Sequence, residues 1–269
     1  MSVTSTLYPA PAAVNVRAMI DPILIAIALV FMLAGFVKGV IGMGLPTVAI
    51  GLLATRMPPA HAIAIVIGPA IITNLWQTFG GPYFFRIVRR LWPLLLACCL
   101  GVWSGADFLS GPFAPYGTIL LGLLLIVYSV ISLRRPQFHV AKGKEGWIGA
   151  ICGYLSGLIA AATGVQVIPA MPFIHALGME RDEFIQALGV FFTTSTVAML
   201  FNLRSGGFLT ADIALPATLG LIAALIGMYL GQVLRLRMPP ETFRRWFLYS
   251  MIALGAYLAI DKIVQLNLI

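Results

Sequence analysis

The sequence predicts an all-α membrane protein, a polytopic bundle of eight full membrane-spanning helices and two short helices. Of its 269 residues, 60% are hydrophobic and 10% are charged, whereas charged residues make up about 25% of an average soluble domain. Eight apolar runs approach the roughly 20 residues that a helix needs to cross a bilayer. The pattern of the first half of the chain also recurs in the second half, which indicates two homologous repeats.

The long apolar runs are separated by short polar or glycine- and proline-rich segments. They cover residues 23–41, 61–79, 91–109, 116–133, 147–162, 184–201, 211–234 and 246–260. Two shorter apolar runs cover residues 45–55 and 165–177. We therefore expect an N-terminal tail over residues 1–21, a first transmembrane repeat over 22–134, a basic connector over 135–146 and a second transmembrane repeat over 147–269.

A glycine-rich stretch from Gly35 to Pro46 closes the first apolar run. Proline suits the first turn of a helix, where its missing N–H group would have no partner in any case. The stretch therefore predicts a helix, a break and a second, shorter helix. Because lipid cannot satisfy exposed backbone groups, a break at membrane depth must be enclosed by protein or must line a watery cavity.

The same stretch appears again 118 residues later, where Gly153–Ile159 repeats the pattern of Gly35–Ile41. The second break is expected over residues 160–169. Further matches follow at offsets between 118 and 126: Pro46 with Pro169, Met57 with Met179, Gly80-Gly81 with Gly206-Gly207, and Pro93 with Pro216.

The distribution of lysine and arginine favours one of two topologies. If each short helix dips in and returns on the same side, ten basic residues lie on one face and six on the other. If each short helix completes a crossing with its break, the division is twelve to four, which obeys the positive-inside rule better. Five crossings in each half would give inverted repeats, as in many secondary transporters. Both termini would then face away from the cytoplasm.

Four pairs of glycines spaced four residues apart predict close helix packing. The pairs are Gly35/Gly39, Gly101/Gly105, Gly153/Gly157 and Gly227/Gly231. Their symmetric placement predicts that homologous helices pack together at the interface between the repeats.

The two breaks are the leading candidates for a ligand site. The N-terminus of a helix carries partial positive charge and free N–H groups, which suit an anion, and two such ends would meet near the middle of the membrane. The alternative is a kink without a ligand. Lys38 is the one basic residue inside a span, and it either snorkels to the interface or faces a cavity where it attracts an anion. Its counterpart is Ser156.

Polar residues occupy matching positions in spans 61–79 and 184–201. Their amide and hydroxyl groups are suited either to coordinating an oxyanion or to hydrogen bonds between helices. The candidate substrate-binding residues are Lys38, Gly42, Gly44, Thr73, Asn74, Gln77, Thr163, Gly164, Gln166, Thr193, Thr194 and Thr196. His61 and Glu183 begin matching spans, where placement at the membrane interface is favoured over proton coupling. No spacing in the sequence indicates a metal site, a cofactor or a partner nucleic acid.

Two related halves, each with a glycine-containing stretch that runs into a proline and a short apolar helix, resemble the TauE/SafE family of membrane transporters. The stretches are Gly35–Pro46 and Gly153–Pro169, and the second departs from the usual pattern because Ala160–Ala162 replace glycines. The resemblance implies export or uptake of small anions such as sulfite, sulfoacetate or another organic anion across the cytoplasmic membrane. We therefore expect a secondary transporter that works by alternating access, with H⁺ or Na⁺ as candidate coupling ions and a homodimer as a candidate assembly.

Other functional classes compete with this reading. An anion channel would share the same composition, and a membrane-embedded enzyme or assembly subunit would share the same spans. An enzyme needs a clustered acid–base or metal constellation, and no such cluster stands out in the spans. The sequence therefore favours a non-enzymatic transporter.

Overall fold

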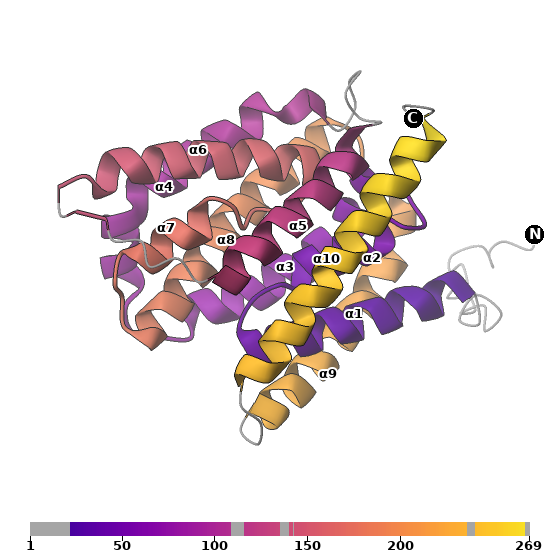
Figure 1. Ribbon diagram of the computed structural model, residues 1–269, viewed down its shortest axis with the longest axis horizontal. Helices are drawn as coiled ribbons and strands as arrows, with labels where there is room; N and C mark the ends of the chain where they lie inside the picture. The colour runs from indigo at the N-terminus through magenta and orange to yellow at the C-terminus, as the bar shows by residue number, and fades with distance from the viewer. Residues whose placement is uncertain (1–21, 109–115, 135–139, 142, 236–239, 267–269) are drawn as a thin grey trace, which may run out of the picture.

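The computed structural model describes residues 22–108, 116–134, 140–141, 143–235 and 240–266, which form α-helices and two short 3₁₀ turns with no strand (Figure 1). The helices are α1 (Pro22–Ile41), α2 (Leu45–Leu53), α3 (Pro59–Phe79), α4 (Phe84–Ser104), α5 (Gly117–Arg134), α6 (Glu145–Thr163), α7 (Ala170–Ala176), α8 (Arg181–Ser205), α9 (Ala214–Arg235) and α10 (Pro240–Gln265). The predicted all-α class is confirmed. The predicted tail, the loop at 110–115 and half of the connector lie outside the described residues.

Eight of the helices are long, and seven of them are long and apolar enough to cross a membrane. The exception is α4, which begins at Phe84 and carries Arg86, Arg89 and Arg90 in its first two turns. Residues 84–90 were expected to be a loop, and that expectation is wrong. The arginines are accommodated in the helix because Arg86 and Arg90 find acidic partners, Glu183 and Glu145.

The first break is short and lies where it was predicted. Helix α1 ends at Ile41, Gly42 and Gly44 follow with φ of 88° and 102°, and α2 begins at Leu45 with Pro46 in its first turn. Such positive φ angles are accessible to glycine at little cost. Three residues therefore separate α1 from α2.

The second break is shorter than predicted. Residues Ala160–Thr163 continue α6, so the break begins at Gly164, whose φ is 72°. Alanine is the strongest helix former, and the three alanines extend the helix where the first repeat has glycine. Residues 165–168 are not helical, so α7 covers only 170–176 of the predicted run 165–177.

The glycine pairs bring helices from different halves into backbone contact. A Cβ atom added at Gly35 or Gly39 would strike the carbonyl oxygen of Ala224 or Met228 on α9. The same is true of α4 and α6, where Gly153 lies on Leu94. Close packing is thus as predicted, but its partners are α1 with α9 and α6 with α4, which are not homologous helices.

The packing pattern is nearly unchanged when each helix is exchanged for the one five places along the chain. Helix α1 packs on α9, and its counterpart α6 packs on α4; α3 packs on α9, and α8 packs on α4. Helices α3 and α8 pack on each other, as do α5 and α10. A two-fold relation between the halves would produce this arrangement.

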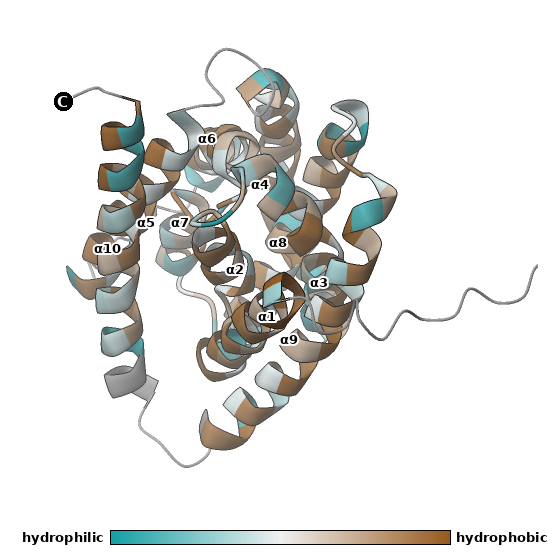
Figure 2. Cartoon of the chain, turned by 90° about the vertical axis from the view of Figure 1, so that its right-hand side faces the viewer, coloured by the Kyte–Doolittle hydropathy of each residue, from teal (hydrophilic) through white to brown (hydrophobic). Residues whose placement is uncertain are grey.

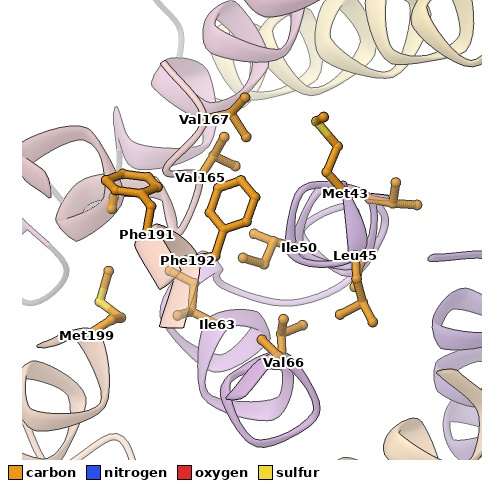
Figure 3. Packing of buried hydrophobic residues seen from close by; sticks show 14 of the residues in the cluster. Met43, Leu45, Ile50, Ile63, Val66, Val165, Val167, Phe191, Phe192 and Met199 are labelled. Atoms are coloured by element: carbon orange, nitrogen blue, oxygen red, sulfur yellow. The ribbon is translucent and has the colours of Figure 1, made fainter. Parts of the chain in front are cut away.

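Hydrophobic residues cover most of the length of the long helices, and many of the polar residues lie near helix ends (Figure 2). Large exposed hydrophobic side chains such as Leu29, Ile226 and Leu230 lie on the long helices, as expected of surfaces that face lipid. Inside, Val165 and Val167 of the second break lie near Phe192 and Ile50 (Figure 3). Met43 of the first break and Leu45 at the start of α2 lie across from them. Both breaks are therefore part of the buried core.

Candidate anion-binding site

A cavity of about 350 Å³ lies at the end of the bundle where α1 and α3 end and α8 begins. Helices α1 and α9 supply one part of its wall, and α3 and α8 supply the other. Its lining comprises Lys38, Gly39, Gly42, Thr73, Trp76, Gln77, Gly80, Gly81, Pro82, Tyr83, Asp182, Ile185, Gln186, Met228 and Gln232. Five of the predicted site residues, Lys38, Gly42, Thr73, Gln77 and their neighbour Asn74, lie on or directly behind this wall.

Lys38 is held in the cavity wall by two neutral side chains of α3. Its Nζ donates to Thr73 Oγ1 at 3.1 Å and to Asn74 Oδ1 at 2.5 Å. The side chain is 5% exposed, so it points into the protein and does not snorkel. Within the described part of the chain no carboxylate forms a salt bridge with Lys38, so its partners do not neutralise its charge.

Thr73 is positioned to accept from the lysine because its own proton is used elsewhere. Thr73 Oγ1 donates to the carbonyl oxygens of Pro69 and Ala70, at 2.9 and 3.2 Å, within α3. A hydroxyl has one proton and two lone pairs, so the oxygen that faces Lys38 is an acceptor. Pro69 lies inside α3 and leaves a backbone carbonyl in the preceding turn without its helical donor.

Gln77 joins the first break to α8. Its Nε2 donates to the carbonyl oxygen of Gly42 at 3.2 Å and to that of Ile185 at 2.8 Å. The carbonyl groups at a helix end have no partner within the helix, and Gln77 supplies one at the end of α1. Gln77 therefore fixes the position of the break beside the cavity.

A chain of hydrogen bonds leads from Lys38 to the second break. Asn74 Nδ2 donates to Thr196 Oγ1 at 3.4 Å, and Gln166 Nε2 donates to the same oxygen at 3.2 Å. Gly164, Gln166 and Thr196 line a second cavity of about 20 Å³, which is about the size needed for a single water molecule. The polar residues of the second repeat thus meet those of the first, but the space beside them is small.

Four predicted site residues line neither cavity and form no hydrogen bond with Lys38. Thr193 Oγ1 and Thr78 Oγ1 form a hydrogen bond of 2.8 Å between α8 and α3. Thr194 donates to Val190 and Thr163 donates to Ile159, each within its own helix. Gly44 caps α2 next to Val37 and Phe247. These contacts are structural.

Comparison with known proteins gives the family. The model of the sulfite exporter TauE/SafE family matches residues 27–258. The chain belongs to the TauE/SafE family. This is a family of membrane transporters and not of enzymes, and the seven apolar helices agree with a multi-pass membrane protein. No curated protein and no solved structure matches the chain.

In this TauE/SafE protein the large cavity forms beside the end of α1 and not at the N-terminus of either short helix. In the first turn of α2, Leu45 and Thr47 are buried. At α7, the N–H group of Ala170 already donates to Ser156 Oγ at 2.8 Å. The free N–H groups that the sequence suggested as anion ligands are therefore enclosed or capped.

Several cavity residues of the TauE/SafE protein were missed from the sequence. Trp76 lies on the cavity-facing side of α3, three residues after Thr73, and such spacing places residues on one helix face, so it could have been found. Gln186 accepts from the N–H of Tyr83 at 2.9 Å and donates to the carbonyl oxygens of Thr78 and Gly81 at 2.8 and 2.7 Å. Nothing in the sequence indicated this contact between α8 and the α3–α4 turn.

Two ion pairs connect three segments of the chain at the cavity end of the bundle. Arg86 contacts Glu183 at 2.7 and 2.8 Å. Arg90 forms two parallel hydrogen bonds of 2.8 and 2.9 Å with Glu145 and also donates to the carbonyl oxygen of Leu177. The start of α4, the start of α6 and the α7–α8 turn therefore lie on one face.

Proposed function

We propose that this TauE/SafE protein is a secondary transporter that carries a small anion by alternating access, with Lys38 as the charged group of its binding site. Sulfite, sulfoacetate or another small organosulfur or organic anion is the proposed substrate. The main observation is a buried lysine in a cavity wall, on a helix long and apolar enough to cross a membrane. Its hydrogen-bond partners, Thr73 and Asn74, are both neutral.

The energetics of Lys38 favour binding of an anion. A charged side chain inside a membrane protein costs at least about 2.5 kcal/mol on insertion scales, and neutral partners recover only part of that cost. An ammonium group has three N–H donors. Two of them are directed to α3, which leaves one for a ligand in the cavity. An anion there would supply the missing negative charge.

We further propose that the two halves are inverted and that the cavity end faces the cytoplasm. The contacts of Arg86 and Arg90 support this topology, because they place residues 86–90 and 177–183 on the same face. These two segments would lie on opposite faces if the short helices only dipped into the membrane. Since the shared face carries most of the basic residues, it is the cytoplasmic one, and both termini would lie outside.

The test is a flux assay in proteoliposomes with sulfite and with sulfoacetate. Two charges about 4 Å apart interact by roughly 4 kcal/mol near a protein surface, so we expect Lys38→Ala to lower flux of the accepted anion at least about tenfold. Lys38→Arg should retain part of the flux. Saturation with anion concentration is expected of a transporter, and flux that rises linearly would indicate a channel.

A matched control variant separates loss of the charge from loss of structure. Ser156→Ala changes the equivalent position in the second repeat, away from the cavity lining. We expect this variant to retain most of the flux if it remains folded. Equal flux in wild type and Lys38→Ala would overturn the proposed site.

A further inference from the structure

The two cavities lie on opposite sides of one contact between α3 and α8. Asn74 Nδ2 donates to Thr196 Oγ1 at 3.4 Å, and the two residues are 122 positions apart, at equivalent places in the two repeats. In the two-fold arrangement of inverted halves proposed above, a residue can meet its own equivalent only at the axis. The contact between Asn74 and Thr196 therefore marks the place where the two halves meet.

The large cavity extends from this contact toward one end of the bundle, and the small cavity extends toward the other. Helix α3 lines the large cavity from Thr73 onward and the small cavity with residues between 63 and 70. Helix α8 lines the large cavity with residues between 182 and 186 and the small cavity with Thr196 and Met199. The two cavities therefore follow one another along the α3–α8 pair.

Equivalent residues line the two cavities. At the same spacing of 122 residues, Met199 in the small cavity matches Gln77 in the large one, and Ile63 matches Ile185. Gln77 Nε2 joins α3 to α8 by donating to the carbonyl oxygen of Ile185 at 2.8 Å. The small cavity is therefore the counterpart of the large one, with an apolar methionine in place of the amide of Gln77.

Apolar side chains close the small cavity. A Cβ atom added at Gly164, in the second break, would lie 2.6 Å from the side chains of both Ile50 and Ile63, so no solute fits between them. Ile63 and Met199 are only 3% and 4% exposed. Helix α3 begins at Pro59, which is about 6 Å along the helix from Ile63. The small cavity is therefore separated from this end of the bundle by a thin apolar layer.

We propose that the small cavity is the closed half of the transport pathway and that Ile63 and Met199 form its gate. In the present state an anion reaches Lys38 through the large cavity and is stopped beyond it, because water does not fill a narrow hydrophobic constriction. In the opposite state α3 and α8 would separate at the gate and approach each other at the large cavity. This inference rests on the proposed alternating-access function and adds to it the residues that block the pathway.

The experiment measures whether the gate opens in the purified protein. Ile63→Cys is the reporter, in a full-length chain whose three free cysteines, Cys98, Cys99 and Cys152, are replaced by alanine. Ile65→Cys is the matched control, because Ile65 is also buried on α3 but does not line the small cavity. A small, negatively charged methanethiosulfonate reagent is added in detergent, where it reaches both ends of the bundle whatever the orientation in the membrane.

We expect Ile63→Cys to react at least about fivefold faster than Ile65→Cys, because even a sparsely populated open state exposes a gate residue. The residue at position 65 stays buried in both states. After reaction and reconstitution into proteoliposomes, the Ile63→Cys protein should lose most of its anion flux, since the added group obstructs the pathway. The treated Ile65→Cys protein should keep its flux.

Met199→Ala and Met251→Ala form a second matched pair, each combined with Ile63→Cys. Both methionines are 4% exposed, but Met251 lies on α10 and lines neither cavity. Met199→Ala should raise the reaction rate about tenfold, because truncation of a buried methionine destabilises the packed, closed gate. Met251→Ala should change the rate little. Equal rates for the two variants would contradict the role of Met199 in the gate.

The outcomes separate the gate from the binding site. Equal reaction rates for Ile63→Cys and Ile65→Cys, in variants that remain monodisperse in size-exclusion chromatography, overturn the gate. Fast reaction of Ile63→Cys together with full flux in Lys38→Ala would keep the gate and remove the proposed anion site. If Ile63→Cys does not fold, Met199→Cys is compared with the same control, and equal rates again overturn the gate.

Discussion

Lys38 and Ser156 occupy the same position in the two repeats and serve different purposes. Lys38 presents a positive charge to the cavity and is held by Thr73 and Asn74. Ser156 accepts a hydrogen bond from the N–H of Ala170 and so caps the short helix α7. A serine oxygen can satisfy an unpaired N–H at a helix start, which a lysine, with donors only, cannot do. The charged group is therefore confined to one half.

The hydrogen bonds of the single residue Gln186 lead to a prediction about thermal stability. Its side chain makes three hydrogen bonds to the α3–α4 turn, and a buried polar group left without a partner costs about 1–3 kcal/mol. Gln186→Leu should therefore lower the thermal unfolding temperature in detergent by several degrees. Gln232→Leu, an exposed position on the same cavity, should change it little. Equal unfolding temperatures for both variants would show that the turn does not depend on Gln186.

Among the predicted site residues, Lys38, Thr73 and Gln77 line the cavity and Asn74 contacts Lys38. They were selected from the sequence because polar groups in apolar spans are conspicuous. It did not identify Gln186 or Tyr83, whose roles arise from contact between α8 and a turn about 100 residues earlier in the chain. Long-range pairing of this kind has no local pattern. The two outcomes considered for Lys38 could not be distinguished from sequence, because which way the side chain points depends on its neighbours on α3.

At the scale of helices, glycine pairs allow the backbones of two neighbouring helices to come into contact. Gly35 and Gly39 on α1 lie against the backbone of α9, and Gly227 lies against Met32 on α1. Small residues permit this approach, from which membrane helices gain van der Waals contact. The sequence predicted close packing but assigned the wrong partners, since glycine spacing shows that a helix can pack closely and not which helix it contacts.

A pair of alanine substitutions tests this packing. Gly227→Ala would place a methyl group on the carbonyl of Met32, whereas Gly68→Ala on α3 meets nothing within 4 Å. We expect Gly227→Ala to destabilise the protein by about 1–3 kcal/mol, as overpacking does, and Gly68→Ala to be neutral or slightly stabilising because alanine favours the helix. Thermal unfolding of the two purified variants measures the difference. Similar stability for both would argue against backbone contact between α1 and α9.

At the two breaks, helix propensity determined where the preceding helix ends. The first break needs Gly42 and Gly44 with positive φ, and its position was predicted well. In the second, the three alanines were expected to belong to the break, but they extend α6 to Thr163. Glycine and proline indicated the positions of both breaks. The lengths of the flanking helices depended on the residues that lie between the glycines and the proline.

For the whole molecule, the helix contacts in the first half correspond to those in the second half, in agreement with the repeats detected in the sequence. The exchange of α1 for α6 and of α9 for α4 preserves the packing. The all-α class was predicted from the composition and the lengths of the apolar runs. The two breaks were predicted from the spacing of glycine and proline. The cavity was not, because it requires α1, α3, α8 and α9 to converge at one end.

For the whole molecule, the proposed topology predicts which residues a reagent outside the cell can reach. Phe85 and Ser205 are exposed residues that the proposed topology places on opposite sides of the membrane. In intact cells, with the native cysteines replaced, an impermeant thiol reagent should label Ser205→Cys and leave Phe85→Cys unlabelled until the membrane is permeabilised. Labelling of Phe85→Cys alone would reverse the orientation, and labelling of both would contradict the five-crossing arrangement.

The single lysine has an electrical consequence for the proposed cycle. If one fixed positive charge accompanies each solute, a monovalent anion is balanced in transit, whereas a divalent anion keeps one uncompensated negative charge. Moving one elementary charge through the membrane potential is worth about 2.3 kcal/mol per 100 mV. Carriage of doubly charged sulfite would then depend on voltage, and carriage of its singly protonated form would not.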